Sequence, residues 1–184
     1  AAEAAVLERL GFTRTATFWV RRFDLTGALV APPPLEPGFT LVDMASHPDY
    51  LGQRLLRYNA FHGGAEYTPE ELPLALMLDE MSRRAPIYHA PTDIGVMAAD
   101  GRLVAGCEAL IDARNLEADV ERVCTHSAFR QRGFARAAIV ECLYRLKEMG
   151  LKSAYITGYS EAAVALYGSL GAVGEQAAYV YERQ

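Results

Sequence analysis

The sequence lacks long apolar runs and has few cysteines. No hydrophobic stretch reaches the roughly 20 residues that a membrane helix needs, and no basic segment followed by an apolar one opens the chain. Cys107, Cys124 and Cys142 are an odd number without CxxC spacing, which indicates neither a disulfide framework nor a zinc site. We therefore expect a cytoplasmic protein without a metal, whose cysteines are small core residues. The alternative is a nucleophilic cysteine, for which Cys124 is the candidate.

An excess of positive charge is also missing. The 184 residues contain 18 Lys and Arg against 23 Asp and Glu, which gives a net charge of -5 at pH 7. A protein of this sign does not attract polyanions, so we expect neither nucleic acid nor a membrane as a partner. The length suits one main domain with an ordinary hydrophobic core. Any cluster of arginines must therefore serve a local purpose.

Prolines are concentrated in the segment ALVAPPPLEPG, from Ala28 to Gly38. Its four prolines remove backbone donors and favour an extended chain, which predicts a linker. We therefore expect three parts: a helix and strand over residues 1–27, a linker over residues 28–36, and the main domain over residues 37–184.

The hydrophobic pattern of the main domain predicts an α/β fold with a mixed sheet. Strands are expected at residues 39–44, 93–99, 102–112, 118–126, 153–159 and 174–184, and helices at 48–62, 68–84, 137–149 and 161–171. Asp100-Gly101 predicts a tight hairpin, and Thr68 followed by Pro69 predicts the N-cap and first residue of the second helix. The element order predicts an antiparallel region that continues into a parallel strand-helix-strand crossover.

The segment HSAFRQRGFARAA, residues 126–138, places three arginines and Gly133 between a strand and a helix. The unpaired N–H groups of a first helical turn favour an anion, and a glycine lets the backbone approach a ligand closely. Arg130, Arg132 and Arg136 add charge for phosphate oxygens. These residues predict a phosphate or pyrophosphate site, although neither a Walker loop nor a GxGxxG motif is present. The alternative is a solvated, arginine-rich turn.

Two segments carry a resemblance to a known family. Arg130-Gln131-Arg132-Gly133-Phe134-Ala135 fits the pattern Arg/Gln-x-x-Gly-x-Gly/Ala, and AVALYGSLG at residues 163–171 follows later. In these motifs the chain resembles the GNAT superfamily of acetyl-CoA-dependent N-acetyltransferases, over about residues 37–184. The resemblance implies a mostly antiparallel central sheet with a splayed edge and flanking helices. Ser127 departs from the family pattern, where proline is frequent, and so does Ser160, where asparagine is frequent.

The resemblance also implies how acetyl-CoA, the donor substrate, would bind. The backbone of residues 123–125 is expected to pair with the pantetheine arm, and the N–H groups of residues 131–135 are expected to hold the pyrophosphate. The implied cofactor-binding residues are Val123, Cys124, Thr125, Arg130, Gln131, Arg132, Gly133, Phe134, Ala135, Arg136, Ser160 and Ala163.

The implied reaction is the direct attack of a primary amine, of a small molecule or a peptide, on the acetyl group in a ternary complex. The resemblance implies that Tyr167 protonates the leaving thiolate, since a tyrosine hydroxyl is protonated at neutral pH. Without the resemblance, Tyr167 is a core aromatic. The alternative function is a noncatalytic or regulatory acyl-CoA-binding module.

A strand carboxylate is the expected general base. The alternation of ADVERVCT places Asp119 and Glu121 on one face of a strand and Val120 and Arg122 on the other. Glu121 is the first candidate, followed by Asp119 and Glu108, and His126 ranks last. A solvated carboxylate is the alternative for each of the acidic residues.

Residues 1–27 repeat the pattern of the end of the chain. When Leu10-Gly11 is aligned with Leu170-Gly171, each segment shows a small helix, Leu-Gly and an alternating strand, with Leu7 at the position of Tyr167. The first segment resembles the tail of a second GNAT domain and predicts a tandem protein with another domain upstream. The alternative is an ordinary helix and strand docked on the sheet edge. The exposed strand at residues 15–23 needs a partner, either this sheet or a second copy in a homodimer.

Overall fold

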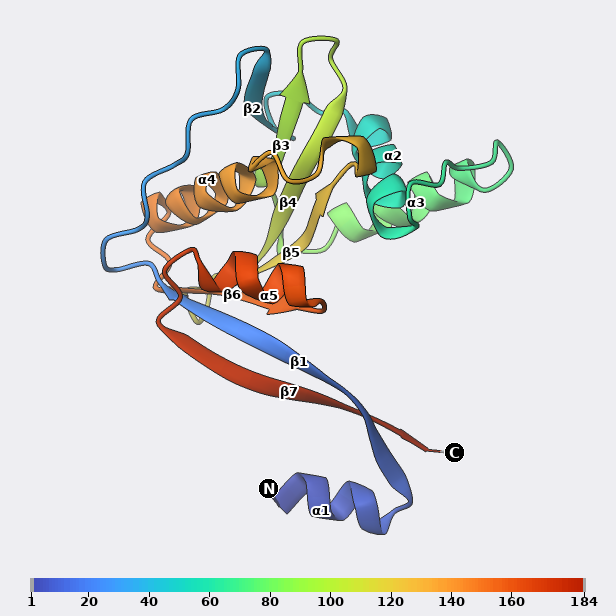
Figure 1. Ribbon diagram of the computed structural model, residues 1–184, viewed down its shortest axis with the longest axis vertical. Coiled ribbons are helices and arrows are strands. Elements are labelled where there is room, and N and C mark those ends of the chain that lie inside the picture. Colours follow the sequence, from blue (N-terminus) through green and yellow to red (C-terminus); the bar gives the residue numbers. More distant parts are fainter. Residues whose placement is uncertain (1, 184) are drawn as a thin grey trace.

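The computed structural model describes residues 2–183, which fold around one seven-stranded sheet. The strands are β1 (Phe12–Asp24), β2 (Phe39–Asp43), β3 (Tyr88–Ala98), β4 (Leu103–Asp112), β5 (Glu117–Thr125), β6 (Ser153–Gly158) and β7 (Gly174–Arg183). The helices are α1 (Ala2–Arg9), α2 (Tyr50–Phe61), α3 (Leu72–Arg83), α4 (Phe134–Glu148) and α5 (Glu161–Gly168). The strand order across the sheet is β2-β3-β4-β5-β6-β1-β7 (Figure 1).

The sheet is mixed, as the element order predicts. Every adjacent pair of strands is antiparallel except β5 and β6, which are parallel and are connected through α4. The turn between β3 and β4 lies at Asp100-Gly101, where Gly101 adopts a φ of 85°. The predicted hairpin and the predicted crossover are therefore both confirmed.

The beginnings of several elements differ from the prediction. The second helix begins at Leu72 rather than near Thr68, so the expected N-cap at Thr68 was wrong. Pro73 occupies the first turn, where its missing N–H costs nothing, and Thr68 instead bonds to the Glu71 carboxylate at 3.0 Å in the turn before the helix. The third strand begins at Tyr88 and has an irregular register up to Asp93.

The strand β1 lies inside the sheet rather than at its edge. Residues 19–24 pair with β6 on one side, and residues 12–22 pair with β7 on the other. Phe23 and the following Leu25 are buried in the main core. Residues 28–36 form no helix or strand, as expected of a linker, and Leu29, Val30 and Leu35 pack against that core.

Two helices cover the middle of the sheet. Helix α4 packs on β3, β4 and β5 through buried residues such as Ile139 and Leu143, whereas α2 packs on β4 and β5 around Leu56. Seven consecutive residues of β4 are buried, so both faces of this strand are covered, and α4 and α2 lie on opposite faces. The three cysteines are buried and free, as predicted. Within residues 2–183, no helix combines the length and hydropathy that crossing a membrane requires.

A charged cluster is buried between α2 and the sheet. Arg57 of α2 lies 2.8 Å from Glu108 and 3.4 Å from Asp93, and the side chains of the three residues are at most 6% exposed. Asp93 also accepts hydrogen bonds from Gln53 at 2.6 Å and from the Tyr88 hydroxyl at 3.0 Å. Burial raises the pKa of Asp93 to about 6, although Arg57 opposes the shift. The cluster fixes α2 on β3 and β4.

We expect the substitution Arg57→Met to lower the free energy of unfolding by about 3–5 kcal/mol, because it leaves buried carboxylates without their central cation. Urea unfolding at pH 7, where Asp93 is ionised, measures the change. The matched control is Arg84→Met, since Arg84 pairs with Glu80 on the surface of α3, where both side chains are more than half exposed. Equal effects of the two substitutions would contradict the prediction.

Candidate functional site

The sheet opens between β5 and β6. Their parallel pairing joins Glu117–Asp119 to Ser153–Tyr155 and goes no further within the described chain. The β5 strand also contains a bulge, because Cys124 pairs with Gly106 while Glu121 pairs with Glu108. At the bulge Arg122 adopts a φ of 51°. A bulge bends the strand that contains it, so the last residues of β5 diverge from β6 with one edge of their backbone free of strand pairing.

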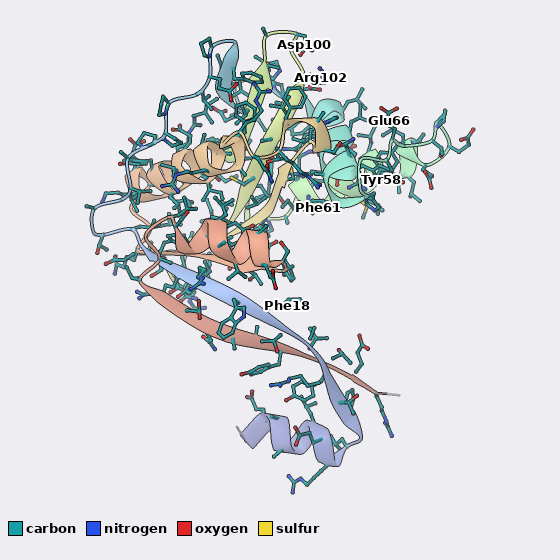
Figure 2. The ribbon with its side chains drawn as sticks, in the orientation of Figure 1. Phe18, Tyr58, Phe61, Glu66, Asp100 and Arg102 are labelled. Atoms are coloured by element: carbon teal, nitrogen blue, oxygen red, sulfur yellow. The ribbon has the colours of Figure 1, made fainter. Side chains whose placement is uncertain are left out.

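A cleft of about 610 Å³ lies along this free edge. Its volume is within the range of small-molecule sites. It is bounded by the end of α2, where Phe61 lies (Figure 2), by β5, by the loop before α4 and by α5. The lining residues are Ala60, Phe61, Val123, Cys124, Thr125, Phe129, Arg130, Gln131, Arg132, Gly133, Phe134, Ala135, Arg136, Ala162, Ala163, Leu166 and Tyr167.

The amino end of α4 presents backbone donors to the cleft. Gly133 is the N-cap residue in a left-handed conformation with a φ of 79°, and Gln131 has a φ of 61°. No side chain caps this helix, and its first turn contains no acidic residue. The first N–H groups of a 15-residue helix therefore have no partner within it, and an anion can satisfy them. This geometry favours the phosphate-site interpretation of the segment at residues 126–138.

The three arginines of the loop are held in place by other parts of the chain. Arg130 donates to the carbonyl of Ala60 at 2.9 Å, and Arg136 donates to the Ser169 hydroxyl at 2.9 Å. Arg132 is paired with Glu36 of the linker. The Arg132 guanidinium also lies over the rings of the aromatic residues Phe39, Phe129 and Phe134. Each of the three guanidinium groups thus has a partner within the protein, although Arg130 and Arg132 are exposed to solvent.

Asn59 connects α2 to the same loop, a contact that no sequence motif indicates. Its side-chain oxygen accepts from the Ser127 N–H at 2.8 Å, and its amide nitrogen donates to the Gly64 carbonyl at 3.1 Å. Asn59 is only 7% exposed. A proline at position 127 has no N–H and could not donate this hydrogen bond. Ser127, where the family pattern often has proline, can donate it to Asn59 of α2. Only the tertiary structure brings these two residues together.

Tyr167 lies on α5 at the inner wall of the cleft and is 5% exposed. Burial raises the pKa of its hydroxyl, with further contributions from Cys107 and Glu121, so the group is protonated at neutral pH. Burial likewise raises the pKa of Cys124 to about 12. Cys124 is therefore a thiol at neutral pH, which disfavours the nucleophilic alternative.

The candidate bases have different surroundings. Burial raises the pKa of Glu121, and the nearby Asp119 adds to the shift. Asp119 itself is exposed, and burial also raises the pKa of its carboxyl. Glu108 is engaged by Arg57 at 2.8 Å and by Arg122 at 3.1 Å. The expected separation of Glu121 and Arg122 onto opposite faces does not persist through the bulge, because Arg122 reaches Glu108, the residue opposite Glu121.

His126 has a structural role that its sequence position did not reveal. Its Nδ1 accepts from the Ala128 N–H at 3.2 Å and caps the short 3-10 helix Ser127–Phe129. Burial lowers the pKa of His126. Because the ring nitrogen is occupied by the cap, His126 remains the weakest of the candidate bases.

The structure brings most of the predicted site residues together. All of the proposed catalytic and cofactor-binding residues line the cleft except Glu121 and Ser160. Glu121 lies close enough to raise the pKa of Tyr167. Ser160 is the N-cap of α5, with its hydroxyl accepting from the Ala163 N–H at 3.3 Å.

Residues 55–172, more than half of the chain, match the model of the acetyltransferase (GNAT) family. Solved structures that share the fold include the following three. A GCN5-related N-acetyltransferase from Sphaerobacter thermophilus is 17% identical with a TM-score of 0.69, and one from Kribbella flavida is 20% identical with a TM-score of 0.64. A tandem GNAT protein from the clavulanic acid biosynthesis pathway is 13% identical with a TM-score of 0.70.

These alignments cover nearly all of this chain but only part of the others. The shares of this chain are 98%, 98% and 96%, and the shares of the other chains are 54%, 59% and 58%, in the same order. The chain thus spans little more than half the length of these structures. No curated protein matches the sequence at a significant level.

Proposed function

Because the chain belongs to the acetyltransferase (GNAT) family, we propose that it transfers the acetyl group of acetyl-CoA to a primary amine of a small molecule or a peptide. The observation that carries the proposal is the cleft, which combines a free strand edge, an uncapped helix terminus and a protonated tyrosine. Each of these features matches one chemical part of the donor: an amide-bearing arm, a pyrophosphate and a thioester.

The donor would bind along β5 and across the start of α4. The free backbone of Val123–Thr125 can hydrogen-bond to the amides of the pantetheine arm, as an added strand does. The N–H groups of Gln131–Ala135 can hold the pyrophosphate, with charge from Arg130 and Arg136. Arg132 would contribute through its backbone, because its side chain is paired with Glu36. Ala163 supplies a small surface at the arm, and Ser160 acts by capping α5.

The chemistry requires two proton movements around the thioester. The amine loses a proton to Glu121, directly or through water, and its nitrogen forms a bond to the acetyl carbon. The carbon–sulfur bond breaks, and the Tyr167 hydroxyl donates its proton to the leaving sulfur. The raised pKa of each group suits its role, since Glu121 becomes a stronger base and Tyr167 stays protonated. Because Cys124 is a buried thiol, a direct transfer is favoured over an acyl-enzyme route.

Incubation of the protein with acetyl-CoA and a panel of primary amines tests the activity. We expect amine-dependent release of free thiol, measured with a thiol reagent, and binding of acetyl-CoA, measured by calorimetry. Binding without thiol release across small-molecule and peptide amines would favour the alternative, a noncatalytic acyl-CoA-binding module. Absence of binding would overturn both functions.

We expect Tyr167→Phe to lower kcat by about 100-fold or more, because the variant loses the proton donor for the thiolate. The dissociation constant for acetyl-CoA should stay unchanged, because the ring is retained. The matched control is Tyr144→Phe on α4, outside the cleft, which should keep full activity. A Tyr167→Phe enzyme with normal turnover would remove the acid role.

The pH dependence identifies the base. A carboxylate acts as a base only when it is ionised, so kcat/KM should fall as the pH drops through the pKa of Glu121. Because that pKa is raised, the fall should occur at a higher pH than for an ordinary glutamate. Glu121→Gln should lower the rate by about 100-fold and abolish this limb of the profile, whereas Asp119→Asn should retain it. The reverse result would assign the base to Asp119.

A further inference from the structure

The first and last helix-strand pairs of the chain repeat each other in three dimensions. Equivalent residues are 160 positions apart, as Gly11 and Gly171 are. Both glycines follow a short helix and adopt almost the same conformation, with φ values of 83° and 84°. Trp19 and Tyr179 are also equivalent positions in the two strands that follow. The sequence repeat is therefore a repeat of backbone structure, α1–β1 and α5–β7.

The two copies are related by a local two-fold axis. Strands β1 and β7 are antiparallel, and Phe18 pairs with Ala178. These two residues are also equivalent in the repeat, since they lie 160 positions apart. A rotation of 180° about an axis between them exchanges the two strands. Whatever packs on one end of this ribbon thus has a symmetric counterpart position at the other end.

One of the two symmetric positions is filled by the body of the domain. Strand β6 pairs with the outer edge of β1 along residues 19–24. The rotation carries this pairing to the outer edge of β7, from Tyr179 onward. Strand β7 is the last strand of the sheet, so within the described chain this edge has no neighbour. An exposed edge of this kind is ready to accept a further strand.

The helices α5 and α1, one at each end of the ribbon, also differ in how far their apolar residues are buried. Leu170, after α5, is 2% exposed in the core, whereas the equivalent Leu10, after α1, is 58% exposed. Val6 of α1 is a further exposed apolar side chain, at 44%. Helix α1 packs mainly on β1 and lies at the far end of the ribbon, away from the other helices (Figure 1). The apolar face of α1 lacks the core that its counterpart has.

The direction of the chain indicates what would occupy the free edge of β7 and cover the apolar face of α1. Strand β7 and α5 follow the strands of their own body, so the body that would enclose α1 and β1 lies before α1 in the polypeptide. The tandem GNAT structure and the one from Sphaerobacter thermophilus align with 96% and 98% of this chain over only 58% and 54% of their own length. Chains of that length have room for a second body.

We propose that α1 and the ribbon of β1 and β7 are the junction between two bodies of the same fold. The second body precedes α1 in the same polypeptide, adds a strand to the outer edge of β7 at residues 179–183 and buries the face of α1 around Leu10. The sheet is then continuous through both bodies about the two-fold axis. This arrangement does not depend on the transferase activity.

The test compares residues 1–184 with the polypeptide extended at its amino end by the residues that its own gene encodes. In the extended protein we expect the amides of residues 179–183 that point away from β1 to exchange with solvent at least about tenfold more slowly. Leu10→Ser should lower its Tm by about 5 °C or more, yet leave the Tm of residues 1–184 almost unchanged. Leu170→Ser is the matched control and should lower both Tm values.

Three results would overturn the proposal. The first is a gene that encodes fewer than about 100 residues before Ala1, too few for a second body of this fold. The second is an extended protein in which amide exchange and the effect of Leu10→Ser equal those of residues 1–184. The third is a dimer of residues 1–184 in light scattering that Leu10→Ser converts to a monomer, which would make a second copy the occupant. The test of the junction measures amide exchange and Tm, whereas the test of the activity measures thiol release. Failure of the activity and failure of the junction are therefore separate outcomes.

Discussion

The early end of the pairing between β5 and β6 is the constraint on which the rest of the structure depends. Parallel strands hold each other through evenly spaced hydrogen bonds, and here those bonds stop after Asp119. The bulge at Arg122 then bends β5 away from its neighbour. The backbone groups that this leaves free face the cleft, where water or a ligand can pair with them. The cleft follows from this opening. Its free strand edge can form hydrogen bonds with a ligand that contains amide groups.

The elements around the cleft keep the opening in shape. On one side, the buried Arg57 fixes α2 on the sheet, and Asn59 of the same helix bonds to the loop before α4. On the other side, α5 carries Tyr167 to the inner wall. An uncapped helix terminus and a protonated tyrosine thus line the same cleft. A basic loop is compatible with the acidic net charge of the chain. The arginines of the loop have partners close by and do not form a polyanion-binding surface.

The strand β1 links the site to the remainder of the molecule. It inserts between β6 and β7, and without it these two strands would have no common neighbour. Residues 12–24 therefore belong to the sheet of the main body, even though their sequence repeats the end of the chain. The same strand forms the ribbon with β7 that projects from the body (Figure 1). The end of β1 near Phe23 thus completes the main core, whereas the beginning of β1 lies outside it.

The sequence by itself determined the order of the elements, the hairpin at Asp100-Gly101, the lack of helix or strand at residues 28–36 and the loop around Gly133, because each depends on local preferences of the backbone or on hydrophobic period. It also indicated Tyr167, through a motif. It did not place the helix start at Leu72, the bulge at Arg122 or the position of β1 inside the sheet. Those features depend on contacts between distant residues, as does the bond from Asn59 to Ser127, 68 positions apart. Only the tertiary structure decided which carboxylates were engaged, since Glu108 meets its two arginines through folding.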